Sequence, residues 1–128
     1  MRKCEQEMIK AVKSALRGEN FKQPGGNTTV VVTHNNPKDM QVHLEVNLHG
    51  NKIAEVQTLG GHLVMFSCSF AGWQSVTTKS RINALARAFG FSGAGARFKN
   101  HGILVGKRLQ TSNHPEVSVS SRDWFSII

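Results

Sequence analysis

Residues 41–49, QVHLEVNLH, limit the fold more narrowly than any other stretch, because apolar and polar side chains alternate along them. Val42, Leu44, Val46 and Leu48 are the apolar members of this pattern. An alternation with a period of two places the apolar side chains on one face of a strand and the polar side chains on the other. The sequence therefore predicts a strand with one face on a core and one face in water.

Further strands are expected on both sides of this one. The β-branched run TTVVVT at 28–33 predicts a strand, which HNNPKD is expected to end. The His-Gly-Asn reversal at 49–51 leads into a partner strand, KIAEVQT. Leu-Gly-Gly at 59–61 then turns the chain into HLVMFSCSF. We expect an antiparallel sheet of three to five strands.

An amphipathic helix is predicted before the strands and a second one after them. The first runs from Arg2 to Arg17, and Gly18 follows as a stop signal. Its apolar stripe consists of Met8, Ile9, Val12 and Leu16.

The second helix is expected near residues 78–89, with Thr77 or Thr78 as its cap and Gly90 at its end. Its apolar stripe consists of Ile82, Leu85, Ala86 and Phe89. At 100° per residue, the positions opposite this stripe are Ser80, Asn83, Ala84 and Arg87, with Lys79 and Arg81 on the flanks. The pattern predicts a separate core side and binding side.

Beyond Gly90 the sequence predicts a glycine-rich loop and one appended basic hairpin, with residues 102–105 as its buried strand. The ending VSVSSRDWFSII is expected to pack on the core. No repeat or long linker divides the chain, so residues 1–128 are expected to form a single α+β domain.

The charge of the chain is concentrated in one region. The formal net charge is +8, yet no Asp or Glu occurs from Leu59 to Pro115. The basic residues of this window are Lys79, Arg81, Arg87, Arg97, Lys99, Lys107 and Arg108. Such an asymmetry favours a polyanion partner, and the alternative is a basic surface that only keeps the protein soluble.

Lys79 and Arg81 lie in the first turn of the predicted second helix, where the helix dipole favours anions. Thr78 and Ser80 would add hydroxyl groups at the same point. Free N–H groups, hydroxyls and cations together predict a phosphate-binding helix start. In the alternative interpretation the threonines only cap the helix and nothing binds.

Two neighbouring features could add contacts to bases. In the segment FGFSGAGARFKNHG, Arg97 and Lys99 bring charge, Phe91 and Phe98 offer rings, and the glycines at 90, 93 and 95 allow close approach of the backbone. This composition suits a single-strand contact surface or a plain hairpin loop. Trp73 stands between the last predicted strand of the sheet and the second helix, where it could stack on a base or plug the core.

Patterns for metal binding and catalysis are not found in the sequence. His43 and His49 share a strand face but lie about 20 Å apart, and no Cys/His spacing resembles a zinc finger. No carboxylate pair lies in the basic half and no nucleophile elbow occurs. We expect no metal, cofactor or enzymatic activity, with a nuclease that uses His101 left open, and no chemistry at Cys4 or Cys68.

The order of helix, strands and helix over residues 1–90, with TTKSR opening the last helix, resembles a double-stranded-RNA-binding domain. The resemblance implies that Lys79 and Arg81 contact phosphates. The stretch AGWQSVTTKSRINAL, together with LHGNKIAEV, is similar to segments of small uncharacterised tailed-bacteriophage proteins, over residues 44–85. That second resemblance implies a phage protein that acts in the bacterial cytoplasm on nucleic acid or on a host machine.

The leading hypothesis is a small non-enzymatic protein that binds nucleic acid, single- or double-stranded, through phosphates. No apolar run of membrane-spanning length and no signal peptide is found, so a cytoplasmic location without membrane contact is expected. One alternative is a phage inhibitor that presents the same basic face to an acidic host enzyme or defence complex. A third is a small-nucleotide binder, and the oligomeric state is left open. The expected contacts are Trp73, Thr78, Lys79, Ser80, Arg81, Arg87, Arg97, Lys99, Lys107 and Arg108.

Overall fold

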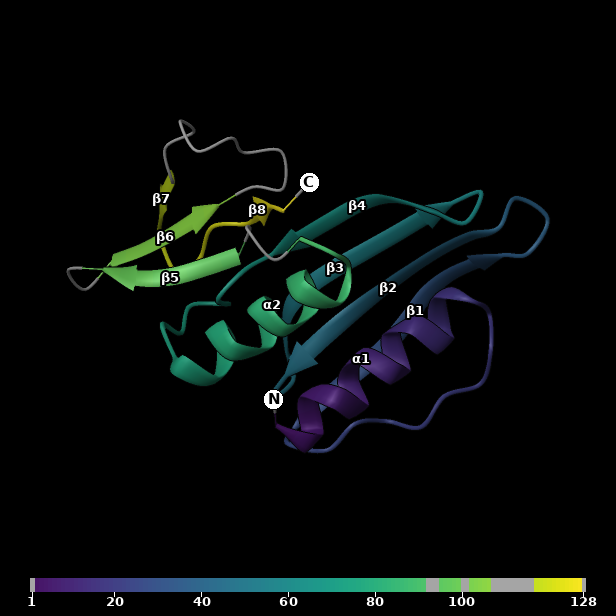
Figure 1. The fold of residues 1–128 in the computed structure, drawn as a ribbon, viewed down its shortest axis with the longest axis horizontal. Helices are drawn as coiled ribbons and strands as arrows, with labels where there is room; N and C mark the ends of the chain where they lie inside the picture. Colours follow the sequence, from purple (N-terminus) through teal and green to yellow (C-terminus); the bar gives the residue numbers. More distant parts are fainter. Residues whose placement is uncertain (1, 92–94, 100–101, 107–116, 128) are drawn as a thin grey trace. The chain divides into compact units, whose positions relative to one another are not determined.

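The structure is a computed structural model that describes residues 2–91, 95–99, 102–106 and 117–127 (Figure 1). Its internal contacts divide the chain into two compact units, Met1–Phe66 and Ser67–Ile128. Each unit is therefore described by itself, and the expected single domain stays a prediction.

The N-terminal unit consists of one helix and an antiparallel sheet. Its elements are α1 (Lys3–Leu16), β1 (Thr28–Asn36), β2 (Gln41–Leu48), β3 (Asn51–Leu59) and most of β4 (His62–Cys68). The strand order is β1-β2-β3-β4-β8, so β1 is an edge strand. The last two residues of β4 already belong to the C-terminal unit, where they pair with β8 (Phe125–Ser126).

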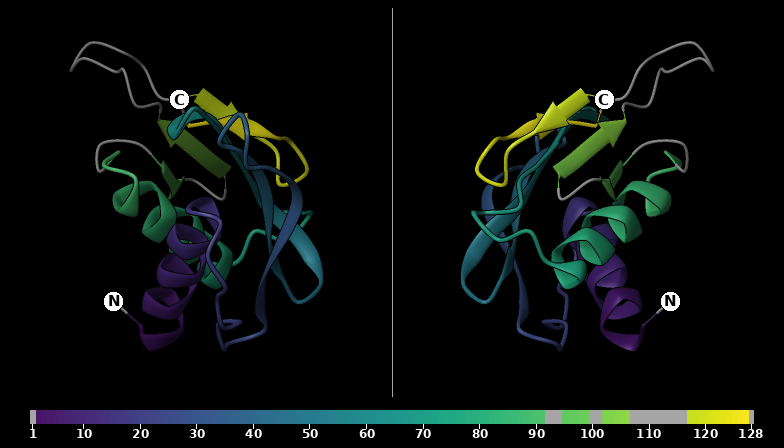
Figure 2. Two further views of the ribbon diagram at one scale, coloured as in Figure 1. Left: turned by 90° about the vertical axis from the view of Figure 1, so that its right-hand side faces the viewer. Right: turned by 90° about the vertical axis from the view of Figure 1, so that its left-hand side faces the viewer.

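The alternating pattern of residues 41–49 does produce a strand with one buried face. Val42, Leu44, Val46 and Leu48 are each at most 5% exposed, whereas the polar residues between them are half-buried. Helix α1 packs on β1 and β2, and Figure 2 shows it running along one face of these strands. The predicted stripe of α1 is confirmed at Met8 and Val12, which are buried.

The two predicted reversals of the sheet are confirmed. His49 and Gly50 both have positive φ, +53° and +78°, as a two-residue type I′ turn between β2 and β3 requires. Gly60 and Gly61 also have positive φ and form the turn between β3 and β4.

The predicted end of β1 is wrong, since the strand continues to Asn36. The turn begins at Pro37, and the Asn36 side chain holds it by donating to Asp39 Oδ2 (2.9 Å) and accepting from the Lys38 N–H (3.2 Å). Three polar residues therefore extend the strand, because pairing with β2 outweighs their weak strand preference.

The outer edge of β1 is closed by a side chain. Gln23 Nε2 donates to the Val30 carbonyl oxygen at 2.8 Å, and the Val30 N–H donates to Gln23 Oε1 at 2.8 Å. The amide group thus replaces a neighbouring strand at this residue.

The C-terminal unit contains a helix and a second sheet, as Figure 1 shows. Its further elements are α2 (Val76–Ala88), β5 (Gly95–Lys99), β6 (Gly102–Gly106) and β7 (Val117–Val119). The strand order is β5-β6-β7. The predicted hairpin and its buried strand are confirmed, because Ile103 and Val105 are at most 2% exposed. The sequence interpretation missed β7, which makes the hairpin a three-stranded sheet. The α+β class itself is confirmed.

Helix α2 is attached to the edge strand β5 by one asparagine. Asn83 Nδ2 donates to the Ala96 carbonyl oxygen (2.9 Å), and the Ala96 N–H donates to Asn83 Oδ1 (2.8 Å). Gly95 makes this approach possible: its φ is +119°, and a Cβ there would lie 2.3 Å from Asn83 Oδ1. Helix and strand are fixed in register by these two residues.

We predict that Asn83→Ala lowers the free energy of unfolding of the C-terminal unit by about 2 kcal/mol, because two main-chain groups of β5 lose their partner. Urea denaturation measures this loss. Gln74→Ala removes an amide from an exposed position of the same unit and should change little. Equal effects of the two substitutions would contradict the assigned role of Asn83.

Candidate functional site

Helix α2 begins at Val76, two residues earlier than the sequence predicted, so its cations lie farther from the helix start. The cap is Ser75, not Thr77 or Thr78: Ser75 Oγ accepts the Thr78 N–H at 3.0 Å. The Thr78 hydroxyl lies 2.7 Å from Ser75 Oγ and is used inside the cap. Lys79 is consequently the fourth helical residue, near the limit of the region where the helix dipole acts strongly.

The buried stripe of α2 is also broader than predicted. Thr78 and Arg81 are 3% and 2% exposed, and Ala84 is fully buried. Arg81 makes interactions within the protein and is not a free cation. The spacing of apolar residues did not predict the burial of Arg81, because an arginine counts as polar in the pattern although its long side chain can lie against apolar neighbours. The predicted separation of core and binding side is wrong at these three residues.

The remaining polar positions of α2 lie on the face that adjoins β5, where Asn83 is bonded to Ala96. Taking Val76 as reference, the helical spacing places Lys79, Ser80, Asn83 and Arg87 within about 60° of it. Arg87 and Val76 are exposed, whereas Lys79 and Ser80 are half-buried. The predicted positions Ser80, Asn83 and Arg87 therefore do share a face, but it is not a free binding side at Asn83, whose amide is bonded to β5.

Lys79 has a partner that the sequence did not reveal. Its Nζ lies 4.8 Å from the centroid of the Phe98 ring, within the range of a cation–π interaction. Phe98 in turn packs against Phe70, with ring centroids 5.7 Å apart. The Phe98 ring of β5 thus stabilises the ammonium group of Lys79, which the dipole of α2 does not favour.

The structure does not bring all predicted contacts onto one face. Successive side chains of a strand point to opposite faces, so Arg97, which is exposed, lies on the face of β5 opposite to Phe98. The side chain of Lys99, and all of Lys107, Arg108 and His101, lie outside the described residues. Of the basic hairpin, only Arg97 can therefore be placed.

Trp73 lies on the surface, with 67% of its area exposed, although a core position was an alternative. The loop that presents it has left-handed backbone at Ala71 and Gly72, and the Gly72 N–H donates to the Ser121 carbonyl oxygen at 2.8 Å. The Arg122 side chain lies against Gly72, with its Nε 3.9 Å from the position of a Cβ. The sequence interpretation missed Arg122, which is distant in the chain and carries no motif.

These features define one surface of the C-terminal unit, here named the Trp73 surface. It consists of Trp73, Val76, Lys79, Phe98 and Arg122. The Trp73 loop and α2 are linked through Phe70, which packs on Phe98 under Lys79. Exposed apolar groups and cations in this part of the unit suit a ligand with both flat rings and negative charge.

Charge is divided unequally between the two units. Residues 67–128 contain eight Lys or Arg and two Asp or Glu, whereas residues 1–66 contain eight and six. In the N-terminal unit, Glu45 and Glu55 both pair with Lys52, whose pKa is raised by these carboxylates, chiefly by Glu55. The C-terminal unit thus holds +6 of the net +8.

The described residues contain no group of three His, Cys, Asp or Glu side chains placed to hold a metal ion. In the same part of the chain, no helix combines the length and hydropathy needed to cross a membrane. Cys68 is fully buried, and burial raises the pKa of its thiol far above the ordinary value.

The fold and the surface together define a small basic α+β protein with an aromatic and cationic surface on its C-terminal unit. The family model described as Kyanoviridae Gp96 protein matches residues 1–126, and the chain belongs to this family of phage proteins. No curated protein and no solved structure matches the chain. The expected phage origin is thereby confirmed, whereas the likeness to double-stranded-RNA-binding domains stays a prediction.

We predict that Cys68 resists thiol reagents in the folded protein at about pH 8, because the buried thiol does not form the reactive thiolate. Ellman's reagent should label the half-buried Cys4 first and Cys68 only after unfolding in urea. A Cys4→Ser variant isolates Cys68. Equal labelling rates of this variant in its folded and unfolded states would contradict the buried position.

Proposed function

We propose that this phage protein binds single-stranded nucleic acid without enzymatic activity, and that the Trp73 surface makes the contact. The observation that carries the proposal is the exposed Trp73 ring, in a loop whose Gly72 lies against Arg122 and whose Phe70 packs on the Phe98 ring under Lys79. No acidic residue belongs to this surface, and Asp123 is the sole acidic residue that the structure describes in the C-terminal unit.

Exposure of Trp73 supports base stacking. Its indole is 67% exposed, and Val76, the first residue of α2, is 60% exposed. Covering a large, exposed apolar side chain with a ligand removes apolar surface from water, and this transfer is favourable. An unpaired base offers a flat face to the indole, whereas bases inside a duplex are already stacked. A single strand is therefore the favoured partner.

Cations at the edge of the surface support contacts with phosphates. Lys79 is held over Phe98, so its ammonium group loses little conformational freedom when it binds an anion. The first N–H groups of α2 add positive potential nearby. Each phosphate neutralised by such a group releases counterions, which makes the affinity dependent on salt.

Exposed cations outside the Trp73 surface extend the proposed contact. Arg87 is exposed on α2, and Arg97 is exposed on the face of β5 opposite to Phe98. Lys99, Lys107 and Arg108 remain proposed contacts on the basis of their charge alone. Thr78 and Arg81 are buried, so we assign them to the packing of α2 and not to the ligand.

We predict that a fluorescein-labelled oligothymidine binds with an affinity that falls steeply between about 50 and 200 mM salt. Trp73→Ala should weaken binding by about tenfold through the loss of stacking. Lys79→Glu combined with Arg122→Glu should weaken it further and reduce the salt dependence. Fluorescence anisotropy measures both effects, with a duplex of the same length as the weaker ligand.

The matched control is Lys13→Glu combined with Lys38→Glu, which makes the same charge change at exposed positions of the N-terminal unit. This control should retain most of the affinity at each salt concentration. Binding that falls equally in both double variants would reduce the effect to net charge and contradict the surface. No binding by folded protein at low salt would overturn nucleic-acid binding and favour the acidic host protein as partner.

A further inference from the structure

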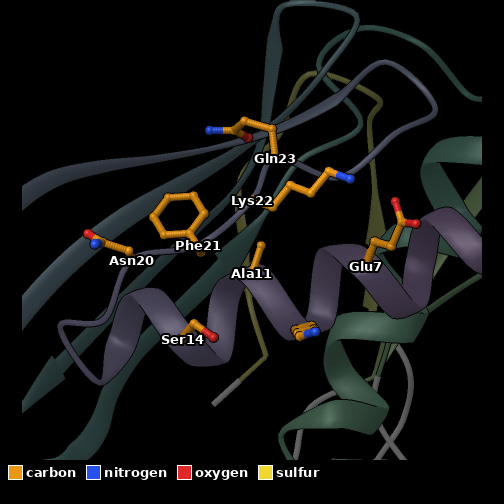
Figure 3. Close-up of a pocket in the computed structure, with 8 residues that line it drawn as sticks. Glu7, Ala11, Ser14, Asn20, Phe21, Lys22 and Gln23 are labelled. Atoms are coloured by element: carbon orange, nitrogen blue, oxygen red, sulfur yellow. The ribbon is translucent and has the colours of Figure 1, made fainter.

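The N-terminal unit contains a pocket of about 420 Å³ that the Trp73 surface does not include. The pocket lies between α1 and residues 20–23, which run beside the helix (Figure 3). Its volume falls within the range of pockets that hold small organic ligands, about 300 to 1,000 Å³.

One face of α1 forms the first wall. Glu7, Lys10, Ala11 and Ser14 line the pocket at spacings of three, four and seven, so they lie on one side of the helix. Ala11 contributes the apolar floor, and its small side chain leaves the space open.

The second wall is held in place by two contacts with secondary structure. Gln23 is fixed to the main chain of Val30 on β1 by two hydrogen bonds of 2.8 Å. The Gly25 N–H donates to Glu7 Oε2 on α1 at 3.3 Å. These bonds attach the loop to the strand and to the helix, so the pocket is formed before any ligand arrives.

The side chains that remain available have a clear chemical character. Lys10 and Lys22 are exposed and form no ion pair with any residue that the structure describes. Phe21, next to Lys22 in the pocket wall, is half-buried. Glu7 and Gln23 are occupied by the loop contacts. An aromatic ring and two unpaired ammonium groups are thus left for a ligand.

We propose that this pocket binds a mononucleotide, with the base against Phe21 and the phosphate at Lys10 and Lys22. Stacking on an aromatic ring and attraction between ammonium groups and phosphate are the two interactions that such a ligand needs. The second oxygen of Glu7 can accept an N–H of the base. An apolar ligand would leave both lysines unpaired, and a metal cation would be repelled by them.

The same chemistry has two sources, a free nucleotide and the terminal nucleotide of a strand. The pocket is open at its surface side, so the volume admits either one. This inference does not depend on the proposed function, because no residue of the Trp73 surface lines the pocket.

The test is isothermal titration calorimetry of the full chain with the four ribonucleoside monophosphates, the matching nucleosides and inorganic phosphate. A monophosphate should bind, and its nucleoside and inorganic phosphate alone should each bind at least about tenfold more weakly. A short oligonucleotide with a 5′ phosphate, compared with one without it, reports on the strand terminus.

Lys10→Glu combined with Lys22→Glu should weaken monophosphate binding by about tenfold or more. Lys10→Glu and Lys13→Glu, each made alone, change the charge of α1 equally, the first inside and the second outside the pocket, and Lys13→Glu should leave monophosphate binding intact. Phe21→Leu should weaken the binding of the monophosphate and leave the binding of inorganic phosphate unchanged. Circular dichroism confirms that each variant is folded.

No heat with any monophosphate, or equal loss with Lys13→Glu, would overturn the pocket. Trp73→Ala separates this inference from the proposed function: it should leave monophosphate binding unchanged while it weakens oligothymidine binding. Loss of both by Trp73→Ala would place the nucleotide at the Trp73 surface and overturn the pocket assignment.

Discussion

An amide side chain pairs with one edge strand of each sheet, β1 and β5, and the two candidate binding regions depend on these contacts. Gln23 pairs with Val30 on β1, and Asn83 pairs with Ala96 on β5. Edge strands expose unpaired N–H and C=O groups, which attract foreign strands and are costly when buried. Here one side chain supplies a donor and an acceptor at once. The bond made by Gln23 also fixes the wall of the pocket, and the bond made by Asn83 fixes the helix that carries Lys79.

Charge and shape are divided between the two units in a consistent way. The N-terminal unit pairs Lys52 with two glutamates and is close to neutral, and it contains a formed pocket. The C-terminal unit has most of the positive charge and an exposed tryptophan. A nearly neutral unit with a pocket suits a small ligand, whereas a basic unit with an open aromatic surface suits a polymer. Both proposals give this member of a phage protein family a ligand built from nucleotides, a strand in one case and a mononucleotide in the other.

Local patterns predicted the elements well where one physical effect dominated. Alternation fixed the buried face of β2, and glycines fixed the two tight turns, because only left-handed backbone closes a two-residue hairpin easily. The end of β1 was predicted wrongly, since pairing with β2 overrides the propensities of Asn35 and Asn36. The cap of α2 was misplaced by two or three residues, because Ser75, Thr77 and Thr78 are equally good caps by residue type.

By itself the sequence determined the α+β class, the order of the elements as far as β6 and the concentration of charge in the C-terminal half. These properties depend on neighbours in the chain or on simple counts. Only the tertiary structure decided that Arg81 is buried, that Lys79 lies over Phe98 and that Arg122 lies beside Gly72. The burial of Arg81 is set by packing. The other two are contacts between residues that are distant in the chain, and no periodic pattern in the sequence predicts them. The pocket beside α1 belongs to the same class, because a loop attached by Gln23 encloses it.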